Sequence, residues 1–184
     1  MLGRFATVMA AVAMVGTMAA GAQENTVMVG GAAMYPSKDI IDNAVNSKDH
    51  TTLVSAVKAA GLVETLKGAG PFTVFAPTNA AFAKLPAGTV DTLLQPANKK
   101  MLTSVLTYHV VAGKHDAKSL MAKARDGQGK AEVKTVSGDT LSVVWKDNKL
   151  WLQDGKGATA AITTADVYQS NGVIHVIDTV LMAK

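Results

Sequence analysis

The spacing of hydrophobic residues changes near residue 130 from a helical period to a strand period. Before that point, apolar side chains recur every three or four residues in short segments at 40–45, 53–60 and 97–107. After it, apolar and polar side chains alternate, as in half-buried strands. Because helices come first and strands mostly later, the pattern predicts an α+β fold rather than a repeating βαβ plan.

Capping residues mark the ends of several predicted helices. Hydroxyl side chains stand before three of them: Ser37 before 40–45, Thr78 before 79–85 and Thr89 before 90–94. Gly61 is placed to end the helix that contains 53–60, because glycine readily adopts the left-handed conformation that follows many helices. The first half of the domain is therefore predicted to be a set of short helices.

The predicted strands form a corner, a meander and a closing hairpin. The corner strand is 72–76, and Pro77 ends it because proline has no N–H to donate. The later strands are predicted at 132–136, 141–145, 150–153, 161–168 and 173–180, with a connection at 169–172 between the last two. Leu141, Val143 and Trp145 fall on one face of their strand.

The first 22 residues have the pattern of a secretory signal peptide. Arg4 precedes an apolar segment at 5–18, and Ala20-Gly21-Ala22 forms a small-residue cleavage site. We expect cleavage after Ala22, a loose N-terminal arm at 23–36 and one domain at 37–184. This predicts a secreted or periplasmic protein that is not an integral membrane protein, whereas the alternative is an uncleaved N-terminal anchor.

Composition narrows the possible chemistry. The chain has no cysteine, so neither a thiolate nucleophile nor a cysteine metal ligand is available. The net charge of +4 is spread thinly, and Lys99-Lys100 is the one adjacent basic pair, so we expect no nucleic-acid partner. His109, His115 and Asp116 could be imagined as metal ligands, but Gly113 interrupts the strand that would align them. Met28 and Met34 are weak evidence for copper(I).

No catalytic or cofactor motif is complete. The pentapeptide G-x-S-x-G of serine hydrolases does not occur. Residues 155–160 match G-x-G-x-x-A, but a strand follows where nucleotide binding requires a helix N-terminus. We therefore predict no catalytic residue, no cofactor and no metal.

Three ordered segments resemble the signature segments of fasciclin (FAS1) domains. They are GPFTVFAPTNAAFAKLP at 70–86, LTYHVVAGK at 106–114 and ADVYQSNGVIHVIDTVLM at 165–182. The chain is most similar to the exported, single-domain fasciclin proteins of bacteria, from about residue 40 to its end. The resemblance implies a wedge of about seven strands in two sheets, with several helices packed on one side.

The resemblance also implies roles for particular residues. The family-motif positions are Thr78, Tyr108, His109, Asn171 and His175, and the Tyr-His pair resembles a core-stabilising element. The apolar neighbours of His175 independently favour a buried, hydrogen-bonded imidazole. The alternative is an enzyme that uses His109 or His175 as a general base.

Asp166-Val167 matches an acidic-aliphatic pair that is implicated in receptor adhesion in animal members of the family. The match is partial, because Ala165 stands where the animal motif has proline. A structural alternative is that Asp166 accepts backbone hydrogen bonds and Val167 fills the core.

The resemblance implies a non-enzymatic domain for cell adhesion or for interaction with the cell surface or extracellular matrix. Its partner would be a surface protein or a polysaccharide. The alternative is a periplasmic carrier that holds an apolar small molecule between its helices and sheets, lined by Met101, Met121, Trp145 and Trp151.

Overall fold

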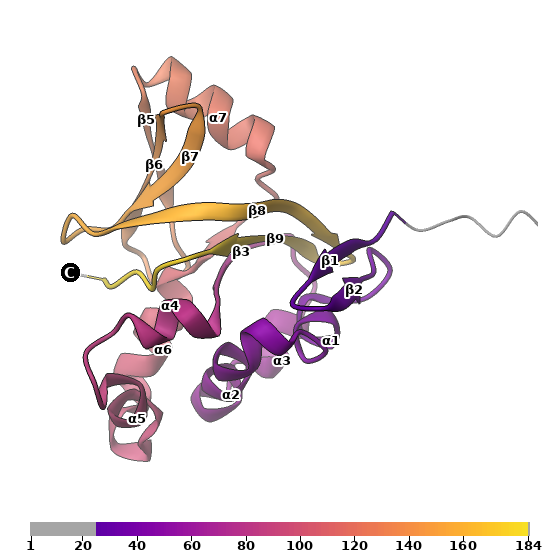
Figure 1. Ribbon diagram of the computed structural model, residues 1–184, viewed down its shortest axis with the longest axis vertical. Coiled ribbons are helices and arrows are strands. Elements are labelled where there is room, and N and C mark those ends of the chain that lie inside the picture. Colours follow the sequence, from indigo (N-terminus) through magenta and orange to yellow (C-terminus); the bar gives the residue numbers. More distant parts are fainter. Residues whose placement is uncertain (1–24, 184) are drawn as a thin grey trace, which may run out of the picture.

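The computed structural model describes residues 25–183, and its centre is a sheet of seven strands (Figure 1). The predicted signal peptide at 1–22 lies outside the described residues. The strand order is β4-β3-β9-β8-β7-β6-β5. The strands are β3 Phe72–Pro77, β4 Val110–Ala112, β5 Lys130–Lys134, β6 Thr140–Lys146, β7 Lys149–Gln153, β8 Thr159–Gln169 and β9 Gly172–Ile177.

The long strand β8 gives the sheet its wedge shape. Its first residues, 159–161, pair with β7, and its later residues pair with β9 across two irregularities in register. Strands β3 and β9 are parallel, and the other neighbours are antiparallel. A further bridge between Val111 and Thr135 brings the two outer strands close, so the sheet is nearly closed. The predicted α+β fold, with seven strands in two layers that share β8, is confirmed.

Most helices lie on one side of this sheet. They are α1 Ile40–Ala44, α2 Thr51–Ala60, α3 Val63–Lys67, α4 Asn79–Ala83, α5 Thr89–Leu94 and α6 Lys99–Tyr108, with short 3-10 helices η1 Lys48–His50 and η2 Pro96–Asn98. Figure 1 shows them at the β3–β9 end of the molecule, whereas α7 Ala117–Asp126 lies beside β5–β7.

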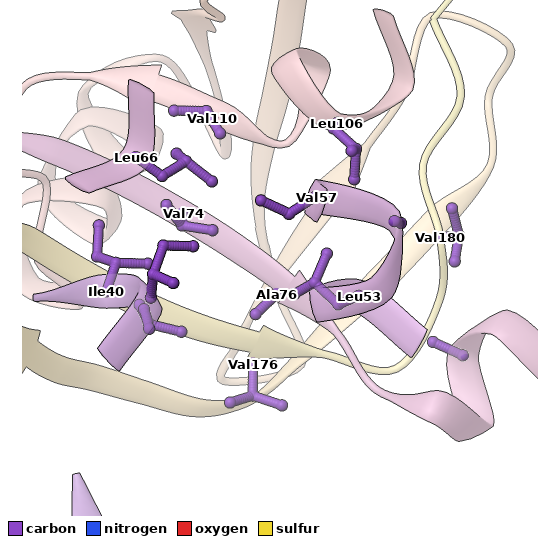
Figure 2. Packing of buried hydrophobic residues seen from close by; sticks show 14 of the residues in the cluster. Ile40, Leu53, Val57, Leu66, Val74, Ala76, Leu106, Val110, Val176 and Val180 are labelled. Carbon is purple, nitrogen blue, oxygen red and sulfur yellow. The ribbon is translucent and has the colours of Figure 1, made fainter. Parts of the chain in front are cut away.

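Two hydrophobic clusters fill the spaces between these layers. The first joins the helices to β3 and β9, and Figure 2 shows Leu53 and Val57 of α2 and Leu106 of α6 pointing toward Val74 and Ala76. The second lies between α7 and the inner face of the meander, where Leu120 packs with Leu141, Val143 and Leu152. Each fully buried side chain of this size contributes about 1.5–3 kcal/mol to folding.

Two elements differ from the sequence predictions. The arm at 23–36, expected to be loose, contains the hairpin of β1 Val27–Val29 and β2 Ala32–Met34. Val29 and Met34 are buried in the first cluster, and Gly30 and Gly31 form the turn with positive φ. Helix α7 was not predicted at all, because lysine, arginine and serine interrupt its buried positions Leu120 and Ala124.

The helix caps are partly as predicted. Thr78 Oγ1 accepts a hydrogen bond from Ala81 N at 3.2 Å, and Gly61 ends α2 with φ 73°. Helix α1 is capped by Asp39 rather than Ser37, since the Asp39 carboxylate accepts from Asp42 N at 2.8 Å. Gly88 is the N-cap residue of α5, so Thr89 is not its cap.

We expect Thr78→Ala to lower the free energy of unfolding by about 1 kcal/mol, because it removes the acceptor for the first turn of α4. Chemical denaturation followed by circular dichroism measures this change. The matched control is Thr89→Ala, which removes the same hydroxyl from a helix that it does not cap. Equal losses in the two variants would contradict the capping role.

Candidate interaction surface around Asp166

Asp166 lies at a bulge in β8 and points toward the start of α7. Its φ of 58° is in the left-handed region, and it lies within the second break in the β8–β9 register, between Thr164 and Val167. The Asp166 Oδ1 atom accepts a hydrogen bond from Ala117 N at 2.6 Å. Asp116 Oδ1 accepts from Ser119 N at 2.7 Å, and hydrogen bonds from the Ser119 side chain and backbone hold the pKa of Asp116 below its usual value. Two carboxylates therefore stabilise the N-terminus of α7.

His175 supports this bulge through hydrogen bonds of both ring nitrogens. Its Nε2–H donates to the carbonyl oxygen of His115 at 2.8 Å, and its Nδ1 accepts from Asp166 N at 3.3 Å. The ring of Phe75 stacks on the imidazole with centroids 5.6 Å apart. Burial lowers the pKa of His175, so the neutral imidazole that these two hydrogen bonds require is favoured. His175 thus positions both the bulge and the loop before α7.

Tyr108 and His109 connect α6 to distant parts of the chain. The His109 Nδ1–H donates to Val105 O at 2.8 Å, and Nε2 accepts from Leu181 N at 3.0 Å. Burial lowers the pKa of His109 to about 4. The Tyr108 hydroxyl donates to Thr140 O at 3.1 Å and accepts from Gly155 N at 3.2 Å, while burial raises the pKa of Tyr108.

Asn171 joins the β8–β9 connection to the helices. Its Oδ1 accepts from Ile40 N at 3.1 Å, and its Nδ2 donates to Leu66 O at 2.6 Å and to Gly68 O at 3.2 Å. Together with the Thr78 cap, the five family-motif side chains all bind backbone atoms. The two motif histidines have both ring nitrogens occupied by backbone groups, an arrangement that leaves no free nitrogen for a general base.

The two members of the predicted interaction pair have different surroundings. Val167 is only 1% exposed and belongs to the first hydrophobic cluster, whereas Asp166 is partly exposed. A partner could therefore contact Asp166 directly, but not the Val167 side chain as it is packed. Both features assumed in the structural alternative are present, because Asp166 accepts a backbone hydrogen bond and Val167 packs in the core.

Further polar groups surround Asp166 at the protein surface. Tyr168 is 38% exposed, and Lys114 Nζ lies 4.7 Å from the centre of its ring. Partial burial and the nearby Asp166 and Asp116 carboxylates raise the pKa of Tyr168. We call Lys114, Asp116, Asp166 and Tyr168 the Asp166 surface. The sequence analysis did not name Lys114 or Tyr168, and it considered Asp116 only as a metal ligand. The Asp116-x-x-Ser119 spacing before an amphipathic segment was a signal that could have identified Asp116 as the N-cap of α7.

The arrangement of the described side chains does not favour metal binding or nucleotide binding. Within residues 25–183, no group of three or more histidine, aspartate or glutamate side chains is arranged to hold a metal ion. Residues 155–158 form a turn whose amides bind the Asp154 carboxylate, and β8 follows instead of a helix.

The four residues predicted to line a carrier pocket do not meet around one cavity. Met101 is 58% exposed on α6, Met121 and Trp145 pack against the second cluster, and Trp151 lies on β7. An apolar cavity does lie between the helices and β3 and β9, but its volume is about 40 Å³. This holds a few waters at most, whereas pockets for small molecules are typically about 300–1,000 Å³.

The fold and this arrangement define an α+β wedge domain with a polar surface patch around Asp166. A model of the fasciclin domain matches residues 48–183. Protein sll1483 of Synechocystis is 48% identical over 159 residues, which cover 86% of this chain and 81% of that protein. The chain therefore belongs to the fasciclin family.

Other relatives have informative names. The cell surface glycolipoprotein MPB83 of Mycobacterium bovis is 36% identical over 166 residues, which cover 88% of this chain and 68% of that protein. The immunogenic protein MPB70 of the same species is 38% identical over 144 residues, which cover 76% and 66% of the two chains. The chain thus spans about two thirds of the length of these mycobacterial relatives.

A solved structure shares the fold. The FAS1 domain pair from the insect cell adhesion molecule fasciclin I matches with a TM-score of 0.70 at 19% identity, covering 80% of this chain and 52% of that chain. At this identity the likeness concerns the fold alone. Within the described part of the chain, no helix has the length and apolar character needed to span a membrane.

Proposed function

We propose that this chain is an exported, non-enzymatic fasciclin domain that mediates adhesion or cell-surface and matrix interaction through the Asp166 surface. Its partner is a surface protein or a polysaccharide. The signal-peptide pattern at 1–22 supports secretion or release into the periplasm. The name of the MPB83 relative as a cell surface glycolipoprotein, and of fasciclin I as a cell adhesion molecule, supports the surface role.

The observation that carries the proposal is the way the Asp166 carboxylate is fixed. Oδ1 is held by Ala117 N, whereas within residues 25–183 Oδ2 has no hydrogen-bond partner. The left-handed backbone at Asp166 costs about 1–3 kcal/mol, and such strain is concentrated at functional positions. A carboxylate that is both rigid and half unpaired is well suited to bind a donor from a partner, because little entropy is lost on binding.

The proposal is tested with Asp166→Asn, which keeps an oxygen for Ala117 N but removes the charge. We expect binding to cell envelope isolated from the source organism to fall by about fivefold or more, because a charged contact is lost. The melting temperature should stay within about 2 °C of the unchanged chain.

Asp91→Asn is the matched control, since Asp91 is an exposed carboxylate on α5, away from β8. It should bind envelope as the unchanged chain does. Undiminished binding by Asp166→Asn would remove the Asp166 surface from the function.

A further inference from the structure

The outer face of the β5–β8 sheet carries a second surface that the proposed function does not use. Leu141, Val143 and Leu152 point inward to the second cluster, where α7 covers them. The alternate residues of the same strands therefore point to the opposite face. These are Lys130, Glu132, Lys134, Thr140, Ser142, Val144, Lys146, Lys149, Trp151, Gln153, Thr159 and Ala161.

This outer face is hollowed in two adjoining places. One depression of about 470 Å³ is lined by Glu132, Ser142 and Gln153, among others. A second of about 440 Å³ is lined by Val144, Trp151, Gln153 and Thr159. Gln153 borders both, so the two depressions adjoin, and Trp151 lines the second. Each is within the size range of ligand sites, unlike the apolar cavity beneath the helices.

Trp151 is the aromatic centre of the second depression. It is partly exposed and lies directly opposite Val144 in the β6–β7 pairing. Its indole N–H is buried and has no acceptor among residues 25–183. An aromatic ring that is surrounded by hydroxyl, amide and carboxylate groups suits a sugar, because a sugar ring has an apolar C–H face and a rim of hydroxyls.

Charge adds a more specific requirement. The first depression is lined by Lys130 against Glu132, Asp139 and Asp154, so it does not favour an anion. The second, which contains Trp151, is lined by Lys146 and Asp147, and Lys149 lies opposite Lys146 in the strand pairing. Lys146 and Lys149 are direct cross-strand partners beside the Asp147-Asn148 turn, and like charges in such positions repel. Neither lysine takes part in the ion pairs of the described residues. An anionic group bound between them would relieve this repulsion.

We propose that the depression around Trp151 binds an acidic polysaccharide. A sugar ring packs on Trp151, its hydroxyls bind Gln153 and Thr159, and its carboxylates pair with Lys146 and Lys149. The inference goes beyond the proposed function, because it gives the domain a glycan-binding face separate from the Asp166 surface.

The test measures binding of the full exported chain to immobilised alginate, a polymer of uronic acids, by biolayer interferometry at 0.15 M salt. We expect Trp151→Ala to weaken binding by about tenfold and Trp151→Phe to retain most of it. The double variant Lys146→Gln/Lys149→Gln should also lose about tenfold, and the binding of the unchanged chain should weaken as salt is raised.

The control for the lysines is Lys99→Gln/Lys100→Gln, which makes the same change in charge on exposed residues of α6. Figure 1 shows α6 far from the hairpin of β6 and β7. This control should bind alginate normally. Without ligand, Lys149→Gln should raise the melting temperature by about 1–3 °C, because it removes the cross-strand repulsion.

Three results would overturn the inference. One is no binding to alginate, the second is equal binding to neutral dextran, and the third is equal binding to polyglutamate with no effect of Trp151→Ala. Envelope binding that depends on Asp166, together with any of these results, leaves the proposed function intact. Alginate binding that depends on Trp151, without envelope binding, would leave the glycan site standing and remove the proposed role of the Asp166 surface.

Discussion

Phe75→Ala is expected to lower the free energy of unfolding by about 3–5 kcal/mol. The Phe75 side chain is fully buried at the centre of β3, and its ring lies between the second hydrophobic cluster and His175. Truncation leaves a cavity and also removes the stacking contact with the imidazole. Because His175 positions the bulge at Asp166, we also expect weaker envelope binding by the folded fraction of this variant.

Chemical denaturation with two controls tests this expectation. Phe75→Leu fills most of the space and should cost clearly less than alanine. Phe72→Ala removes the same ring from a partly buried position of the same strand, so its cost should also be smaller. A loss below about 2 kcal/mol in Phe75→Ala would mean that the surrounding side chains collapse into the space.

Local signals accounted for much of the fold. The corner strand, the Thr78 cap and the Gly61 terminus each depend on a few adjacent residues, and all three are present. The β6–β7 pairing follows from alternation and from the Asp147-Asn148 turn, where both residues have positive φ. Each of these features depends on residues that lie within one turn or one strand of one another.

The pairing of strands that are distant in the sequence could not be predicted from local patterns. Strand β3 pairs in parallel with β9, about a hundred residues later, and no local pattern specifies that neighbour. The β1–β2 hairpin was missed because three-residue strands are too short to show a period. The family resemblance supplied the wedge, since motif spacing carries information that periodicity lacks.

The candidate site was predictable only in part for a related reason. Asp166 was identified from its motif, but its hydrogen bond goes to the start of α7, a helix that the sequence analysis did not contain. The carrier residues were chosen for side-chain type alone. Met101 and Trp151 lie on different elements, and only the topology shows that they do not converge.

Acidification from pH 6.5 to pH 4 is expected to reduce stability substantially, with His109 contributing about 3 kcal/mol. The pKa of buried His109 is lowered from 6.5 to about 4 in the folded chain. In this window the unfolded chain binds a proton that the folded chain excludes, so the free energy of unfolding falls as the pH falls. Well below pH 4 both states are protonated and this contribution stops changing.

The hydrogen bonds explain why protonation is resisted. The His109 Nε2 atom accepts from Leu181 N, so a proton there would replace this bond with two opposed donors. Burial outweighs the hydrogen bond to Val105 O and the charge of Asp154, which both raise the pKa of His109. Burial also lowers the pKa values of His50 and His175, which adds to the same trend. The pKa values of Asp42, Asp116 and Asp178 lie below the ordinary value of 3.8, so their stabilising effects are lost at lower pH.

Urea denaturation at half-unit pH steps measures how the free energy of unfolding changes with pH. The His109 contribution is the difference in this slope between the unchanged chain and the variant. His109→Gln retains an acceptor for Leu181 N but cannot take up a proton, so its stability should fall by about 3 kcal/mol less between pH 6.5 and pH 4. Leu93→Ala destabilises the first cluster through a buried side chain on α5, leaves His109 and its partners Val105 and Leu181 unchanged and should keep the full slope. Parallel pH curves for His109→Gln and the unchanged chain would show that His109 is protonated in the folded protein as readily as in the unfolded one. That result would be incompatible with an imidazole that holds the C-terminal segment through Leu181.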